Sequence, residues 1–135
     1  MTYKENAKKY IEQYLTEYSG IKNFMDNITN IAKEKGYVET LYHRRRYVPE
    51  LKSNNYMVRK FGDRAAMNTP IQGTAADIMK IAMKNVLKEL KTRNMKTKIV
   101  LQVHDEMMLE ATLDEVDEVK ELLRECMESA CKLNV

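Results

Sequence analysis

The residues best suited to chemistry are the neighbouring acids Asp105 and Glu106, which follow His104 between two apolar runs. The first run, Lys98–Val103, is rich in β-branched residues, and the second, Glu106–Ala111, alternates polar and apolar residues. Only His104 and Asp105 separate the runs, so we expect a tight β-hairpin. His-Asp is a poor choice for a turn where Asn-Gly or Asp-Gly would accommodate positive φ, and such misfits often mark functional sites.

A rigid hairpin would hold Asp105 where a hard divalent cation such as Mg²⁺ could bind its oxygens. Such a cation can activate an attacking hydroxyl and neutralise phosphate charge during an in-line displacement. The alternative is a solvated acidic turn beside an exposed His104, since acidic turns are common. One hairpin also supplies too few ligands, because two-metal chemistry needs carboxylates from at least one other segment. The residues alone leave both interpretations open.

The beginning of the sequence predicts two helices. Thr2 and Glu5 have capping-box spacing, and apolar residues then recur every three or four positions over Ala7–Tyr18. Ser19-Gly20 breaks this pattern before a second amphipathic helix. Gly36 stands where the left-handed C-terminal cap of that helix belongs.

A short hairpin is expected next, with strands over Tyr37–Leu41 and Arg45–Val48 and an end at Pro49. His43–Arg46 forms a compact basic run on a chain whose net charge is only +3. Such a run is compatible with a phosphate-binding face and equally with a solvated loop.

Two further helices are expected on either side of Thr69. A short helix would cover Tyr56–Asn68. Thr69 would cap a new helix, with Pro70 in its first position and Gln72 at capping-box spacing. This second helix continues with clean apolar periodicity.

The last helix is expected to open with a capping box of Thr112 and Glu115. No repeat or Pro/Ser-rich linker interrupts the chain, so no domain boundary is placed within it. The resulting fold class is α+β, with helices packed on antiparallel β-hairpins.

Composition supports an ordered, helix-rich chain, with 44% hydrophobic and 32% charged residues but only 4 Gly and 2 Pro. No apolar run approaches the roughly 20 residues that a membrane span needs. The N-terminus does not look like a secretion signal, and the two cysteines form no metal motif or disulfide framework. We therefore expect a cytoplasmic protein without a membrane partner.

The segment Leu101–Glu106 resembles motif C of A-family DNA polymerases of the bacterial DNA polymerase I type. Gly36–Leu41, followed by Arg44–Tyr47 and Pro49, resembles that family's hairpin before its thumb-facing helices. Asp63–Ile78 resembles the segment that lies along the primer–template duplex. These blocks occur in the family's order, and the similarity covers essentially all 135 residues.

The resemblance implies a role for each matching residue. Asp105 would be a catalytic metal ligand, and Glu106 its auxiliary neighbour that also contributes to the metal site. The positions through which the family touches the primer–template minor groove are matched by Arg64, Asn68, Gln72 and His104. Polar side chains there can test base-pair geometry without reading sequence, because the groove offers similar acceptors for every pair.

Each of these DNA-contacting residues also has a purely local interpretation. Gln72 could only complete the capping box, Asn68 could be a turn residue, and Arg64 could pair with Asp63 or another surface acid. His104 could simply be the turn residue that its position requires. The Arg44–Arg46 run could contact phosphates or form salt bridges inside the protein.

The implied parent is a bacterial DNA-directed DNA polymerase of replication and repair. It would extend a primer 3′-end with deoxynucleoside triphosphates by two-metal nucleotidyl transfer, using Mg²⁺ or Mn²⁺ as a substitute. Residues 1–135 would be a partial polymerase domain, the palm and part of the fingers, truncated at both ends. The second aspartate strand and the triphosphate-gripping fingers helix would lie in other segments, so we expect the isolated chain to be inactive.

The alternative functions are a non-catalytic remnant that binds duplex DNA and a degenerate relative that serves as an interaction module. A metal-dependent nuclease ranks last, because it would need more acids around Asp105. Apolar faces made to pack on other polymerase segments would favour self-association, although the oligomeric state stays open.

Overall fold

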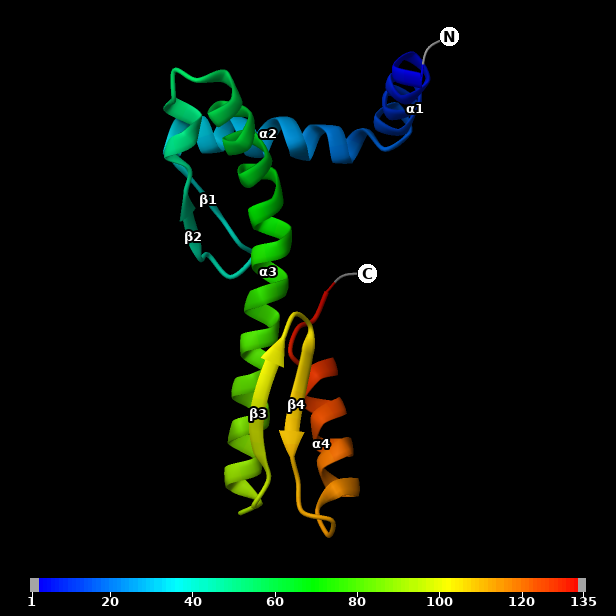
Figure 1. The fold of residues 1–135 in the computed structure, drawn as a ribbon, viewed down its shortest axis with the longest axis vertical. Helices are drawn as coiled ribbons and strands as arrows, with labels where there is room; N and C mark the ends of the chain where they lie inside the picture. The colour runs from blue at the N-terminus through cyan, green and yellow to red at the C-terminus, as the bar shows by residue number, and fades with distance from the viewer. Residues whose placement is uncertain (1–2, 134–135) are drawn as a thin grey trace. The chain divides into compact units, whose positions relative to one another are not determined.

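The computed structural model describes residues 3–133, which fold into helices and two antiparallel hairpins (Figure 1). The expected α+β class is confirmed. Contacts divide the chain into an N-terminal unit that ends at Gly73 and a C-terminal unit that begins at Thr74. The elements are α1 (Tyr3–Glu17), α2 (Ser19–Lys35), β1 (Tyr37–Glu39), β2 (Arg45–Tyr47), the 3-10 helix η1 (Pro49–Lys52), α3 (Tyr56–Thr92), β3 (Lys98–Val103), β4 (Glu106–Glu110) and α4 (Val116–Glu128).

The core of the N-terminal unit lies where the end of α2, the β1–β2 hairpin, η1 and the first part of α3 meet. Gly36 ends α2 in the left-handed conformation at φ 77°, and its N–H donates to the Ala32 carbonyl at 2.9 Å. The expected cap is therefore confirmed. Apart from Leu51, the core is formed by small and β-branched side chains that allow close approach of the elements: Ala32, Val38, Val48, Ala65 and Ala66.

The break between α1 and α2 falls at Tyr18, one residue before the expected Ser19-Gly20. The proposed cap residue Thr2 lies outside the described residues. None of the described α1 residues is buried, and the apolar side chains Tyr10, Ile11 and Tyr14 are exposed. The periodicity therefore predicted the helix correctly, and its apolar face is exposed in the described residues.

The prediction of two separate helices around Thr69 is wrong, because α3 runs continuously from Tyr56 to Thr92 with Pro70 inside it. A proline in a helix interior costs about 3 kcal/mol. Burial offsets that cost here, since Ala65, Ala66 and Thr69 are all packed inside the N-terminal unit. The Thr69 hydroxyl caps nothing and instead donates to the Ala65 carbonyl at 2.6 Å, one turn back.

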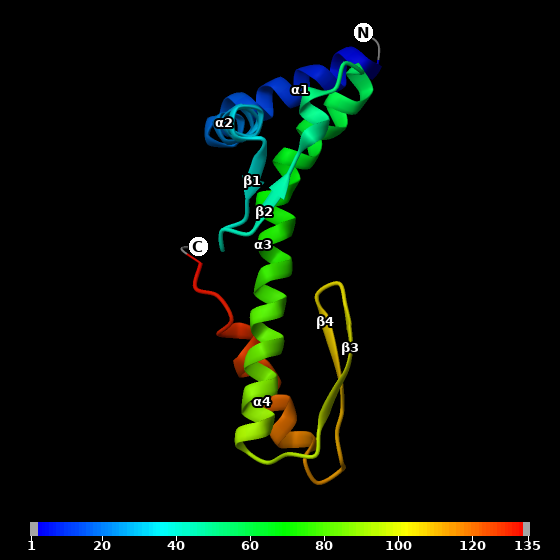
Figure 2. The ribbon, with the colours of Figure 1, turned by 90° about the vertical axis from the view of Figure 1, so that its left-hand side faces the viewer.

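The C-terminal unit packs one face of the β3–β4 hairpin against the end of α3 and against α4 (Figure 2). Its core joins Val86 and Leu90 of α3 to Leu122 and Cys126 of α4, covered by side chains of the hairpin. The strands pair antiparallel with an irregularity between Ile99 and Leu101 that the sequence did not reveal. The opposite face of the hairpin leaves apolar side chains exposed: Leu101, Val103 and Met108.

The predicted capping box of Thr112 and Glu115 is not formed. Glu115 precedes the first residue of α4, but its side chain makes no capping hydrogen bond. Its carboxylate accepts hydrogen bonds from Lys96 and Thr97 instead. The Glu115 carboxylate therefore bonds Thr97, 18 residues away in sequence, and not the helix N-terminus beside it. Within residues 3–133, no helix is long and apolar enough to cross a membrane.

Candidate functional site

The tip of the β3–β4 hairpin has the two-residue turn that the sequence predicts. Val103 pairs with Glu106 across the hairpin, and His104 and Asp105 form the turn between them. His104 adopts φ 53°, whereas Asp105 has no positive φ. This is the sign pattern of a type II′ turn, whose first position normally takes glycine. His104 is therefore unfavourable at its turn position, as expected, because a residue with a bulky side chain adopts a left-handed backbone conformation.

Side chains at this tip are directed to solvent. His104, Asp105 and Glu106 are all exposed. The Gln102 side-chain amide donates to the His104 carbonyl at 2.5 Å, which ties the turn to β3. The hairpin thus presents two neighbouring carboxylates on a short turn that a side chain of the preceding strand braces.

Carboxylate oxygens suit a hard cation such as Mg²⁺, so Asp105 and Glu106 have the right donor chemistry. They do not make a complete site. Among residues 3–133 no group of three or more His, Cys, Asp or Glu side chains is gathered to hold a metal ion. A metal site at this hairpin would need further carboxylates from another segment.

Arg64, Asn68 and Gln72 form a second set, in the N-terminal unit. They are spaced four residues apart in α3, so they follow one another along one face of the helix. All three are exposed. The structure thus brings together three α3 residues in one unit and three hairpin residues in the other.

Three of the local alternatives are wrong. Gln72 completes no capping box and Asn68 is no turn residue, because both lie inside the continuous helix α3. Asp63 pairs with Lys60 at 3.3 Å, and within the described chain Arg64 has no ion-pair partner. The local interpretation of His104 as a turn residue is correct, but its left-handed backbone makes it an unfavourable one.

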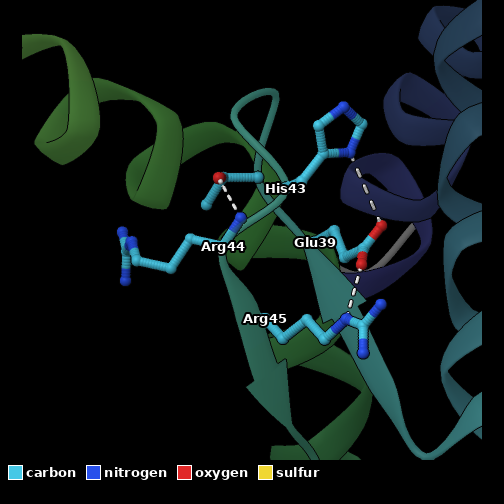
Figure 3. Close-up of polar contacts among 5 residues, drawn as sticks. Glu39, His43, Arg44 and Arg45 are labelled. Atoms are coloured by element: carbon cyan, nitrogen blue, oxygen red, sulfur yellow. Dashed lines mark hydrogen bonds and ion pairs between the residues drawn. The ribbon is translucent and has the colours of Figure 1, made fainter.

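The arginine run divides into three different environments, and Figure 3 shows those of Arg44 and Arg45. The Arg45 Nε donates to Glu39 Oε1 at 2.8 Å, and its guanidinium lies 4.7 Å from the centre of the Tyr37 ring. This hydrogen bond lowers the pKa of Glu39 and raises that of Arg45. The Arg44 Nη2 donates to the Gly73 carbonyl of α3 at 2.9 Å. Arg46 is exposed on β2.

The sequence reasoning gave no role to two residues beside this run, Thr40 and Gly73. Thr40 is buried at the hairpin tip, and its Cγ2 would lie 2.7 Å from a Cβ atom added at Gly73. The signal in the sequence was the glycine itself, since an isolated glycine inside a helical pattern often marks a close packing contact. His43, with φ 60°, shows that this turn also favours glycine.

Comparisons with known proteins agree with this geometry. The family model described as DNA polymerase family A matches residues 2–135. DNA polymerase I of Lactococcus lactis subsp. lactis is 51% identical over 132 residues, which cover 98% of this chain and 15% of the relative. DNA polymerase I of Geobacillus stearothermophilus is 48% identical over the same share of each chain.

A solved structure has the same fold. It is the POL domain of Pol1 from M. smegmatis in complex with DNA primer-template and dNTP, with a TM-score of 0.89 and 44% identity. The match covers 97% of this chain and 23% of that one. The chain therefore spans a minor part of the length of its relatives. By the family model and by identity over nearly its whole length, this chain belongs to DNA polymerase family A.

Proposed function

We propose that this chain forms the palm and part of the fingers of a DNA-directed DNA polymerase of the bacterial DNA polymerase I type. The main support for this proposal is the family match over residues 2–135, within which Asp105 lies on an exposed and strained hairpin turn. The enzyme would extend a primer 3′-end with deoxynucleoside triphosphates in cytoplasmic DNA replication and repair. Residues 1–135 would then be a partial polymerase domain.

Asp105 and Glu106 would hold Mg²⁺, or Mn²⁺ in its place. The bound ions would neutralise phosphate charge and lower the pKa of the attacking hydroxyl during nucleotidyl transfer. The short β3–β4 turn would fix the position of Asp105. Glu106 is the first residue of β4, where strand pairing with Val103 restrains its backbone. The remaining carboxylates would come from another segment of the polymerase.

Arg64, Asn68 and Gln72 would face the primer–template duplex from α3, and His104 from the hairpin. Their exposure supports this role, as does the likeness to a polymerase domain solved with primer-template DNA. Amide, imidazole and guanidinium groups can donate to the acceptors in the minor groove, which are similarly placed for every base pair. These residues would therefore check pairing geometry near the growing end.

The test is primer extension by a chimera. The matching 132 residues of Lactococcus lactis DNA polymerase I would be replaced by this chain, to which they are 51% identical. We expect the chimera to extend a primer with Mg²⁺ and the isolated chain to be inactive. A folded chimera that binds primed DNA but extends nothing would contradict the assignment. Extension by the isolated chain would contradict the proposal that its metal site is incomplete.

A second candidate is a non-catalytic module that binds duplex DNA. The exposed row of Arg64, Asn68 and Gln72 favours it, because this row is complete within one compact unit. The isolated chain would then bind duplex DNA with an affinity that falls steeply with salt. Binding without any preference for a primed end, and without dependence on Asp105, would favour this module over the polymerase.

A further inference from the structure

The tip of the β1–β2 hairpin is locked onto α3 by groups from three residues. The Arg44 Nη2 donates to the Gly73 carbonyl at 2.9 Å, and the two residues are 29 positions apart in the sequence. Hydrogen bonds from a charged donor are shorter and about twice as strong as those between neutral groups. A helix carbonyl has two lone pairs, so Gly73 can accept this bond without giving up its place in the helix.

The hairpin tip is internally closed, which gives Arg44 a fixed starting point. The backbone N–H of Thr40 donates to the Arg44 carbonyl at 3.0 Å, and the Thr40 hydroxyl accepts from the Arg44 N–H at 3.2 Å. In Figure 3 the side chain of Arg44 extends away from the side of the hairpin where Arg45 meets Glu39. The two neighbouring arginines therefore bond different parts of the N-terminal unit.

Gly73 makes the contact sterically possible. A Cβ atom at this position would lie 2.7 Å from Thr40 Cγ2 and 3.4 Å from Arg44 Nη2. A separation under 3.0 Å is a collision, so any other residue at position 73 would push the hairpin tip away from α3. Thr40 is only 4% exposed, so this residue of the tip is packed in the protein.

The contact lies where α3 needs support. Pro70 has no N–H, so it cannot donate to the Ala66 carbonyl, and the helix ladder is interrupted in the turn just before Gly73. Asn68 and Gln72 flank this interruption. Without a brace, the side chains on both sides of Pro70 would vary in relative direction, because proline weakens and bends a helix.

We propose that Arg44 is a positioning residue, which latches the hairpin tip to Gly73 and thereby keeps Asn68 and Gln72 aligned for duplex DNA. This inference rests on the proposed function for its DNA-binding consequence. The latch itself is a property of the N-terminal unit. The neighbouring arginines of the basic run then have different roles, because Arg44 bonds α3 and Arg45 bonds Glu39.

The test compares Arg44→Ala with Arg44→Lys and with Arg46→Ala in the whole 135-residue chain. Arg46 is the matched control, because it is exposed on the same hairpin and, in the described part of the chain, bonds no other side chain. Hydrogen exchange would be followed at the α3 amides from Ala66 to Gly73. Exchange in α2 near Ala32, in the core of the same unit, reports whether the N-terminal unit of each variant remains folded.

We expect Arg44→Ala to speed exchange around Gly73 about tenfold, as expected for loss of a charge-assisted bond. Arg44→Lys should restore part of the protection, and Arg46→Ala should leave it unchanged. Equal protection in all variants would overturn the latch, whether or not the chain binds DNA. If Arg44→Ala also loses protection near Ala32, its N-terminal unit is unfolded and Arg44→Lys decides. Intermediate protection near Gly73 in Arg44→Lys would then support the latch, and wild-type protection would overturn it.

DNA binding supplies the second readout. Arg44→Ala should raise the Kd for primed duplex severalfold while leaving the slope of log Kd against log salt unchanged. An arginine that touches phosphate would instead reduce that slope by about one. A reduced slope for Arg44→Ala would overturn the positioning role. If no variant binds DNA but exchange still responds to Arg44, the proposed function fails and the latch stands.

Discussion

The hydroxyl of Thr97 donates to the carboxylate of Glu115 at 2.6 Å, which ties the segment before β3 to the start of α4. The same carboxylate accepts from the backbone N–H of Lys96 at 2.8 Å and from that of Thr97 at 3.0 Å. The bond from Lys96 is the largest cause of a lowered pKa of Glu115, followed by the Thr97 hydroxyl. An ionised Glu115 therefore helps to hold the β3–β4 hairpin against α4, together with the apolar core between them.

Glu115 should make the C-terminal unit sensitive to acid. Its pKa in the folded chain is below its ordinary value of 4.5. Its contribution to stability is therefore complete above that value and is lost as the pH falls through the lower folded value. We expect Glu115→Gln to lower the Tm by a few degrees at pH 7 and to flatten the loss of Tm below about pH 5. Glu128→Gln, on the exposed side of α4, is the control. An identical pH profile for wild type and Glu115→Gln would contradict this role.

Gly73→Ala and Gly20→Ala should have opposite effects on stability. At Gly73 the added Cβ meets Thr40 Cγ2 at 2.7 Å, so we expect a loss of about 1–3 kcal/mol from overpacking. At Gly20, within α2, nothing lies within 4 Å, so alanine should gain up to about 1 kcal/mol of helix propensity. Urea unfolding measures both. A stabilising Gly73→Ala would show that the hairpin tip is not seated against α3.

His104→Gly should separate stability from function. The left-handed φ of 53° costs a histidine about 1–2 kcal/mol, which glycine avoids, so the variant should resist urea better. Primer extension by the chimera should nevertheless fall, because the imidazole that would contact DNA is gone. Asn94→Gly is the matched control, with the same φ of 53° and a residue that tolerates it. If His104→Gly improved both properties, the histidine would have no functional role.

Gln72 and Asn68 should matter for DNA binding and hardly at all for folding. Both are exposed in the interior of α3, so Gln72→Ala and Asn68→Ala should change the free energy of unfolding by less than about 0.5 kcal/mol. Each should weaken binding of the isolated chain to primed duplex by about 1 kcal/mol or more. Gln13→Ala in α1 and Asn23→Ala in α2 replace the same residue types and should have no effect on binding. Equal losses in the control variants would contradict a specific α3 face.

The sequence predicted most reliably the features that depend on neighbouring residues. The β3–β4 turn at His104 and Asp105, the β1–β2 hairpin and the Gly36 cap are all local patterns, and the structure confirms them. The family resemblance identified Asp105 and the α3 residues, whose roles stay predictions. Burial could not be predicted in the same way, because the apolar face of α1 has no covering element in the described chain.

The failures came from contacts between distant residues. Thr69-Pro70 is a valid start signal for a helix, but the packing of Ala65 and Ala66 keeps α3 continuous through it. Glu115 is a valid capping-box residue, but Thr97 offers it a hydroxyl and a backbone N–H. No periodicity or spacing rule reports such competition, because the competing partner lies elsewhere in the sequence.

We propose that Asp105 is one of the metal-binding carboxylates of a family A polymerase. Its most direct test is the rate of primer extension by the Lactococcus lactis chimera carrying Asp105→Asn. We predict a loss of about a thousandfold, which corresponds to the several kcal/mol that a bound metal contributes. Asp117→Asn, whose side chain is 98% exposed in α4, should retain full activity. An Asp105→Asn chimera that extends primers as fast as its parent would contradict the claim.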